Sequence, residues 1–224
     1  MSFSDIALAC VNKLQPYVPG KPIEELERQY GVKNIVKLAS NENPLGPSES
    51  VLAAITKAAK DLTRYPDGNG FILKTALAEK YQLGLSQITL GNGSNDVLEM
   101  IARTFVSPAD EVLYSQHAFA VYPIVTQAIG AKGVIAAARD YGHDLQAMST
   151  LINDRTKLIF IANPNNPTGT CLADDELEAF ISQVPLSTLV VLDEAYVEYG
   201  DGTADTISWL AKYPNLIITR TFSK

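Results

Sequence analysis

The sequence predicts an α/β domain of three layers, α/β/α, in which helices cover both faces of a mostly parallel sheet. The first observation is that strand-like and helix-like stretches alternate along most of the chain. The second is that several strand-like runs are apolar throughout, which is typical of strands buried on both faces. The third is size, because 224 residues are enough to bury one full core together with an arm.

The chain is expected to divide into an arm with short helices, residues 1–45, and a large domain, residues 46–224. Three prolines within Pro16–Pro22 fix the backbone of the arm in an extended conformation. In the helix expected at Ser48–Asp61, an apolar stripe that includes Val51 and Ile55 predicts a buried face.

The remaining elements follow from apolar periodicity and turn residues. Helices are expected at Pro22–Tyr30, Phe71–Tyr81, Val97–Phe105, up to Ile129, Asp144–Leu151 and Asp174–Phe180. Strands are expected at Val36–Ala39, Ile88–Leu90, Asp110–Ser115, Val134–Ala137, Lys157–Ala162, Thr188–Leu192 and in the run from Leu216.

Composition excludes several classes of partner. The net charge is −7 and there is no long basic run, which argues against nucleic acid or an anionic membrane as partner. No stretch is long and apolar enough to span a bilayer, and no signal sequence is recognisable. Cys10 and Cys171 form no metal or redox motif and predict free thiols, so we expect no metal site and a cytoplasmic location.

A glycine-rich turn, Gly91–Asp96, lies between a predicted strand and a predicted helix. Such a turn presents backbone N–H groups and the positive end of the helix dipole to an anion. Asp96 stands where a dinucleotide fingerprint has its third glycine, and no Gly-Lys-Ser/Thr is present. A dinucleotide or nucleoside triphosphate is therefore disfavoured, whereas a phosphate monoester and a simple tight connection both stay open.

Three more polar motifs follow apolar runs. Asn163–Gly169 contains two Asn-Pro steps, which make a rigid turn at the edge where α/β sheets bind ligands. Asp193 ends the most apolar run, and it is either a paired structural carboxylate or an acceptor for a positive ligand nitrogen. Lys224 is either a surface lysine or an amine whose lowered pKa allows a Schiff base with an aldehyde.

Taken together, the four motifs resemble in order and spacing those of the fold-type I aminotransferases that depend on pyridoxal 5′-phosphate (PLP). Three other stretches, Tyr17–Pro22, Ser40–Gly46 and Tyr65–Gly68, are similar more narrowly to the histidinol-phosphate aminotransferases. The resemblance covers the whole chain and implies the large domain of such an enzyme. The family continues past its cofactor lysine into a small domain, which is absent here, so we expect the protein to continue as well.

The resemblance implies how the cofactor ring is held. Lys224 carries PLP as a Schiff base and moves the proton during catalysis, while Asp193 pairs with the pyridinium nitrogen. Asn166 and Tyr196 hydrogen-bond the phenolic oxygen of the ring, and Phe119 stacks on its face.

The resemblance also implies phosphate and substrate contacts. Ser94, Asn95 and Ser223 hold the cofactor phosphate. Tyr65 reaches that phosphate from the neighbouring subunit, which implies a homodimer. Two further residues match family positions near the substrate, Tyr17 and Asn41.

The implied reaction is transamination in histidine biosynthesis, which converts L-histidinol phosphate and 2-oxoglutarate into imidazole acetol phosphate and L-glutamate. The partners are then small molecules and a second copy of the chain. A cis peptide bond at Asn166–Pro167 is expected. Three alternatives stay open: an aromatic aminotransferase, a threonine-phosphate decarboxylase, and a PLP-binding module without catalysis.

Overall fold

The computed structural model describes residues 3–200 and 205–224. They divide into two units. The sheet unit comprises residues 1–17 and 91–223, and the helical unit comprises residues 18–90 together with Lys224. The predicted division into an arm and a large domain at residue 45 is a different partition and stays a prediction.

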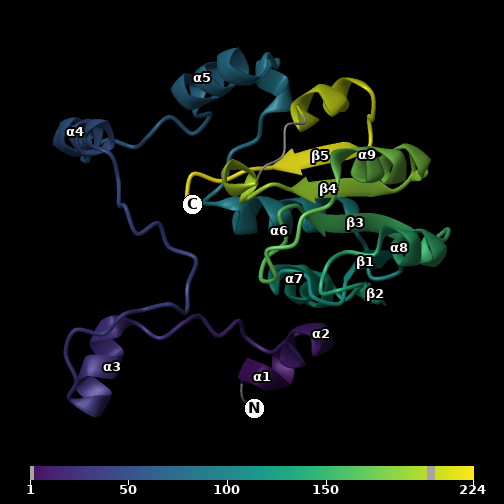
Figure 1. The fold of residues 1–224 in the computed structure, drawn as a ribbon, viewed down its shortest axis with the longest axis horizontal. Coiled ribbons are helices and arrows are strands. Elements are labelled where there is room, and N and C mark those ends of the chain that lie inside the picture. The colour runs from purple at the N-terminus through teal and green to yellow at the C-terminus, as the bar shows by residue number, and fades with distance from the viewer. Residues whose placement is uncertain (1–2, 201–204) are drawn as a thin grey trace. The chain divides into compact units, whose positions relative to one another are not determined.

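The sheet unit is built on five parallel strands in the order β2-β1-β3-β4-β5 (Figure 1). Their bounds are β1 Glu111–Ser115, β2 Lys132–Ala136, β3 Thr156–Ala162, β4 Leu189–Asp193 and β5 Leu216–Thr219. The predicted mostly parallel sheet is confirmed, and these five strands lie within one or two residues of the predicted ones. Ala162, Asp193 and Thr219 are register partners, so the carboxyl ends of the last three strands meet at one edge.

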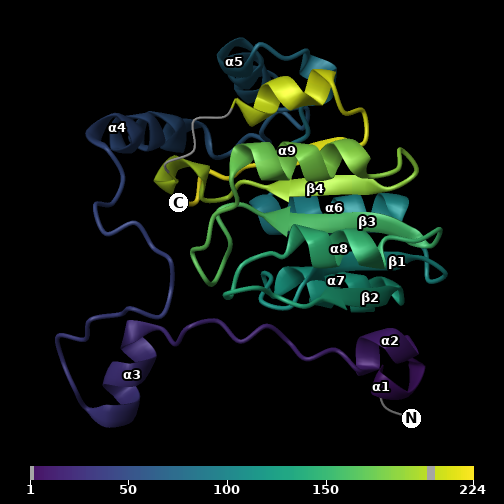
Figure 2. The same cartoon turned by 45° about the vertical axis from the view of Figure 1, so that its right-hand side comes forward.

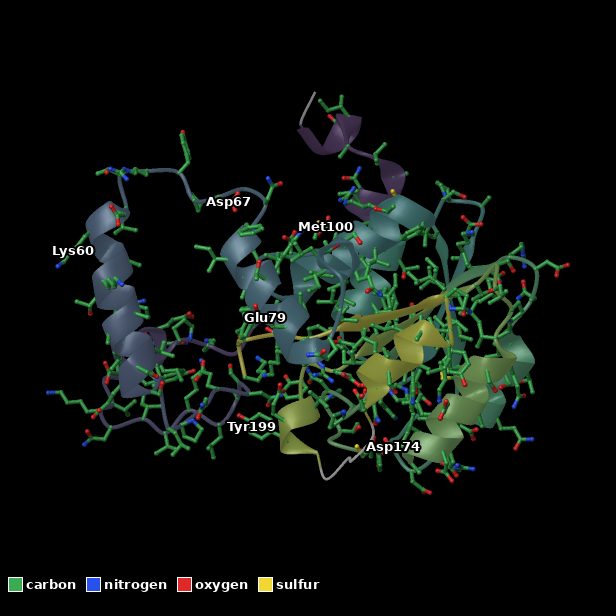
Figure 3. The ribbon with its side chains drawn as sticks, turned by 90° about the horizontal axis from the view of Figure 1, so that it is seen from above. Lys60, Asp67, Glu79, Met100, Asp174 and Tyr199 are labelled. Carbon is green, nitrogen blue, oxygen red and sulfur yellow. The ribbon has the colours of Figure 1, made fainter. Side chains whose placement is uncertain are left out.

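Helices cover both faces of this sheet. Helices α6 (Ser94–Phe105) and α7 (Val121–Ile129) lie on one face, and α8 (Leu145–Leu151) and α9 (Asp174–Gln183) lie on the other (Figure 2). Seen from above, Met100 on α6 and Asp174 at the start of α9 lie on opposite sides of the sheet (Figure 3). The predicted α/β/α layering is confirmed.

Two hydrophobic clusters form the core, one on each face, and β3 supplies both. Leu158, Phe160 and Ala162 point to the cluster under α6 and α7. Ile159 and Ile161 point to the opposite cluster. Successive side chains of a strand alternate between faces, so an entirely apolar strand is what a doubly covered sheet requires.

Short helices complete the sheet unit. Helices α1 (Phe3–Ile6) and α2 (Ala9–Asn12) begin it, and Gln127 of α7 donates a hydrogen bond to the carbonyl of Cys10 at 3.3 Å. Two 3₁₀ helices, η3 (Val197–Tyr199) and η4 (Thr206–Ala211), lie between β4 and β5. Among the described residues, none of the helices combines the length and apolar character needed to cross a membrane.

The described residues of the helical unit contain helices and no strand. Its elements are α3 Ile23–Tyr30, α4 Glu49–Ala58, η1 Ala59–Asp61, α5 Phe71–Tyr81 and η2 Leu85–Gln87. The Ser48 hydroxyl caps α4 by accepting from the Val51 amide at 3.4 Å. Asp67, labelled in Figure 3 beside the start of α5, accepts from the Asn69 and Phe71 amides at 2.9 and 2.8 Å. The predicted helices are confirmed here.

Three local predictions are wrong. Val36–Ala39 and Ile88–Leu90 form no strand, because within the described residues neither segment pairs with another strand. The predicted buried stripe of α4 is exposed, with Val51 at 47% and Ile55 at 59% of full exposure. Apolar periodicity identifies the face of a helix that favours burial, but it does not supply the surface that buries it.

Candidate active site

Asp193 is the most deeply buried of the predicted site residues. It ends β4 with 3% of its surface exposed. Its Oδ2 accepts a hydrogen bond from the Tyr122 hydroxyl at 2.8 Å, and its Oδ1 accepts one from the Thr219 hydroxyl at 2.9 Å. Burial raises the pKa of Asp193, although these bonds and that of the Ala195 amide act in the opposite direction.

The side-chain partners that hold Asp193 within the described residues of the sheet unit are neutral hydroxyls. Within the described residues of that unit, it takes part in no ion pair. A buried carboxylate without a cation is an unfavourable arrangement in a protein unless a ligand supplies the missing charge. The site therefore fits a ligand that brings a protonated nitrogen to the carboxyl edge of the sheet.

Aromatic rings pack around Tyr122, the tyrosine that is hydrogen-bonded to this carboxylate. Tyr122 is fully buried and stacks on Phe160, with ring centroids 4.5 Å apart and planes inclined by 5°. Phe119 meets Tyr122 edge-to-face at 5.8 Å and is itself half-buried. Phe119 is thus on the same side of the sheet as Tyr122, with part of its ring accessible.

The Asn-Pro turn follows β3 at the same edge. The Asn166 amide donates to the Tyr196 hydroxyl at 3.3 Å, so these two predicted site residues lie together. The Asn163 backbone amide donates to the Asp193 carbonyl at 3.0 Å, which joins the turn to the end of β4. The predicted cis bond at Asn166–Pro167 is confirmed, and a second one at Asn163–Pro164 was not predicted.

The start of α6 has the features of an anion site. Gly93 precedes it with φ of +81°, and no side chain caps the helix. Asp96 turns back to accept from the Asn92 amide at 3.0 Å. Ser94 is half-buried and Asn95 is exposed, and both belong to the first turn. This helix of 12 residues therefore presents its first amides and a serine hydroxyl without an internal capping group.

The other predicted residues are more exposed. Ser223 is exposed, and its amide donates to the Thr221 hydroxyl at 3.1 Å. In the helical unit, the Lys224 ammonium donates to the Asn41 carbonyl at 3.4 Å, and Tyr65 is fully exposed. Tyr17, on the N-terminal segment of the sheet unit, is 56% exposed. The approach of Lys224, Tyr65 and the two predicted substrate residues to Asp193 stays a prediction.

No alternative metal centre competes with this interpretation in the described part of the chain, where no group of three or more His, Cys, Asp or Glu side chains is placed to hold a metal ion. Cys10 and Cys171 form no disulfide in the described part of the chain.

Comparison with known proteins agrees with this geometry. The model of the family described as aminotransferase class I and II matches residues 33–224, most of the chain. The chain belongs to this family. Its matched region contains every element that builds the carboxyl edge described above.

Curated aminotransferases include close relatives. The chain is 59% identical over 216 residues to histidinol-phosphate aminotransferase 1 of Idiomarina loihiensis, which covers 96% of this chain and 59% of that protein. It is 57% identical over 224 residues to histidinol-phosphate aminotransferase 1 of Nitrosococcus oceani, covering 99% of this chain and 60% of that protein. The chain thus spans about three-fifths of the length of these relatives.

A solved aminotransferase shares the fold. The crystal structure of histidinol-phosphate aminotransferase from Sinorhizobium meliloti in complex with pyridoxal-5′-phosphate superposes with a TM-score of 0.88 at 32% identity. The match covers 98% of this chain and 59% of that one.

Sequence reasoning missed several residues of this aminotransferase edge. Tyr122 and Thr219 were not assigned, although they hold both oxygens of Asp193. Glu194 and Arg220 were not paired, although their side chains approach to 2.7 Å. A hydroxyl residue at the end of a buried strand was the available signal for Thr219. Nothing local marked Tyr122, which is 71 residues from its partner.

Proposed function

We propose that this chain forms most of the large domain of a PLP-dependent aminotransferase that acts on L-histidinol phosphate and 2-oxoglutarate, giving imidazole acetol phosphate and L-glutamate in histidine biosynthesis. The observation that carries the proposal is the buried Asp193 carboxylate, which ends β4 and, among the described residues of its unit, is held by two neutral hydroxyls. Family membership and the names of the relatives at 57–59% identity support the reaction and the substrate.

The residues of the sheet unit suit a phosphorylated pyridine aldehyde. When bound, PLP supplies a protonated ring that accepts electrons from a substrate carbanion. Asp193 keeps that ring nitrogen protonated, because a buried carboxylate gains most from a neighbouring cation. Asn166 and Tyr196, already joined by a hydrogen bond of 3.3 Å, offer an amide and a phenol to the ring oxygen.

Phosphate binding is assigned to the start of α6. Ser94 and Asn95 lie in the first turn, where uncapped amides and the helix dipole favour an anion. Ser223 adds a hydroxyl from the segment that follows β5. Phe119 offers a half-buried ring face for stacking on the pyridine ring.

Lys224 holds the cofactor covalently and moves a proton at the reacting carbon. It lies five residues after Thr219, the β5 residue that is hydrogen-bonded to Asp193. We propose that this short connection lets the amine reach the carboxyl edge of the sheet, where α/β proteins bind ligands. An amine there can act as the general base and acid of the proton transfer.

The active protein is proposed to be a cytoplasmic homodimer. A fully exposed tyrosine, Tyr65, is free to contact a second copy of the chain and is assigned to the partner's cofactor phosphate. Tyr17 and Asn41 are assigned to the substrate. The net charge of −7 supports small-molecule partners, with neither nucleic acid nor membrane involved, and two cysteines without a disulfide in the described residues support a reducing compartment.

The proposal is tested on the full-length protein that contains this chain. Incubation with PLP followed by borohydride should leave one stable cofactor adduct on Lys224, located by peptide mass spectrometry. Lys224→Ala should lose the adduct and lower turnover of L-histidinol phosphate by about 10²–10⁴-fold, the usual contribution of a proton-transfer group. Lys60→Ala, a change at an exposed lysine of the helical unit, is the matched control. Normal turnover in Lys224→Ala would remove the proposal.

A further inference from the structure

The Tyr122 hydroxyl has one described partner, the Asp193 carboxylate. Tyr122 is fully buried, and burying a phenol is unfavourable unless its hydroxyl is hydrogen-bonded. A phenylalanine would fill the same space in the cluster under α6 and α7 without that requirement. The hydroxyl therefore has a purpose beyond packing, and its position points to the carboxylate.

The ring of Tyr122 is held so that this hydroxyl has one position. It stacks on Phe160 of β3 at 4.5 Å and receives Phe119 edge-to-face at 5.8 Å. Burial and the adjacent Asp193 charge raise the pKa of Tyr122 well above its ordinary value, so the phenol stays protonated and remains a donor.

Thr219 holds the other oxygen of the carboxylate. It is the register partner of Asp193 on β5, is 3% exposed, and donates at 2.9 Å. A carboxylate offers about four acceptor positions. Tyr122, Thr219 and the Ala195 amide occupy three of them, which leaves one for a further donor.

We propose that Tyr122, assisted by Thr219, is a positioning residue that holds the Asp193 carboxylate ionised and in one orientation toward the pyridine nitrogen of the cofactor. This inference rests on the proposed function, because it takes Asp193 as the partner of that nitrogen. Tyr122 also touches Phe119, the residue assigned to the face of the ring. One side chain of α7 thereby supports both groups that orient the cofactor.

The test is Tyr122→Phe in the full-length protein loaded with PLP. Losing one hydrogen bond to a charged group should weaken PLP binding and lower kcat by about tenfold each, with KM for L-histidinol phosphate within about twofold of wild type. The fall of PLP affinity in acid should begin at higher pH than in wild type, because this hydrogen bond lowers the pKa of Asp193. Absorbance and fluorescence titrations measure affinity without relying on turnover.

Two further variants keep the test decisive. Tyr114→Phe removes the hydroxyl of another buried tyrosine in the same cluster and should change none of these readings. Thr219→Val keeps the side-chain shape and should also make PLP affinity begin to fall at a higher pH than in wild type. Thr219→Ser, which keeps the hydroxyl, should show the wild-type pH dependence. If Tyr122→Phe does not fold, the comparison of Thr219→Val with Thr219→Ser tests the proposal on its own.

The outcomes separate the two proposals. A wild-type protein that forms no PLP adduct on Lys224 would overturn the proposed function itself. A wild-type protein that binds PLP normally, with Tyr122→Phe and Thr219→Val indistinguishable from Tyr114→Phe in affinity, pH profile and kcat, would overturn this inference and leave the proposed function standing.

Discussion

Two buried carboxylates lie at opposite ends of the same sheet and differ in the charge of the groups that contact them. Glu111 begins β1 and is 2% exposed. It accepts from Asn153 at 2.9 Å and forms ion pairs with Lys132 at 3.0 Å and Arg155 at 2.6 Å. Asp193 ends β4 and is 3% exposed, but its side-chain donors are two neutral hydroxyls.

The pKa values of the two carboxyls move in opposite directions. The Asn153 hydrogen bond, together with Lys132 and Arg155, holds the pKa of Glu111 below its ordinary value. Burial raises the pKa of Asp193 despite its hydroxyl partners. At the amino end of the sheet, the charge of Glu111 is already paired with two cations. At the carboxyl end, the negative charge of Asp193 can be neutralised by a ligand cation.

Glu194, at the same edge, differs from Asp193 in its ion pairing, although burial raises the pKa of Glu194 as it raises that of Asp193. It follows Asp193 directly and is 2% exposed. Its side chain pairs with Arg220 at 2.7 Å and accepts from the Thr206 hydroxyl at 2.5 Å. Two adjacent carboxylates thus share one edge, and within the sheet unit only Glu194 has its own cation among the described residues.

Replacing the uncompensated carboxylate should have the largest effect. Asp193→Asn should lower turnover by about 10²–10³-fold, the usual loss when one electrostatic group of an active site is removed. In the cofactor-free protein the same change should raise Tm at neutral pH, by about 2–4 °C for each kcal/mol gained. The reason is that the amide keeps the size of the side chain and removes a buried charge.

The pH dependence of that stabilisation has a definite sign. The pKa of Asp193 is raised in the folded state, so its favourable contribution is present in acid and is lost as pH rises through the folded pKa. Thermal unfolding of cofactor-free protein should show the advantage of Asp193→Asn growing with pH. A lower Tm for the variant at neutral pH would contradict the contrast with Glu111.

Breaking the ion pair of Glu194, at the same edge, should have a smaller effect than Asp193→Asn. The effect should be on the free energy of unfolding. Glu194→Gln should lower the free energy of unfolding by about 3 kcal/mol, because it removes the charge of Glu194 from its ion pair with Arg220, whose side chain is only 25% exposed. Urea unfolding of the full-length protein measures this. The control is Glu99→Gln, which removes an exposed ion pair with Arg103 and should change stability by less than about 0.5 kcal/mol.

Much of the sheet unit was predictable because its signals are local. Most strands of the sheet contain an apolar run next to turn residues, and Asp144 caps α8 by accepting from the Ala147 amide at 2.9 Å, as its position predicts. The polar motifs after β3 and β4 were predicted to meet, and the register pair Ala162 and Asp193 brings them together.

The features that sequence missed depend on pairing between distant segments. Val36–Ala39 has a strand-like composition, but a strand requires a neighbour, and composition does not provide one. Tyr122 is one of ten tyrosines, and only the placement of α7 on the sheet selects it as the partner of Asp193. Long-range hydrogen bonds of this kind are consequences of topology and leave no local pattern.

The smallest expected effect is at the compensated carboxylate of the amino end. Glu111→Gln should lower stability by about 1 kcal/mol at neutral pH, because Lys132 and Arg155 are 65% and 64% exposed and water solvates them once the charge is gone. The folded pKa of Glu111 is lowered, so its contribution is present above the unfolded pKa and is lost as pH falls through the folded value. The gap between wild type and variant in urea unfolding should therefore close in acid, as it does for Asp193→Asn, but here the wild type is the more stable protein at neutral pH, whereas there the variant is. A gap that widened in acid would show that the cations beside Glu111 do not stabilise its charge, and the contrast between the two ends of the sheet would then fail.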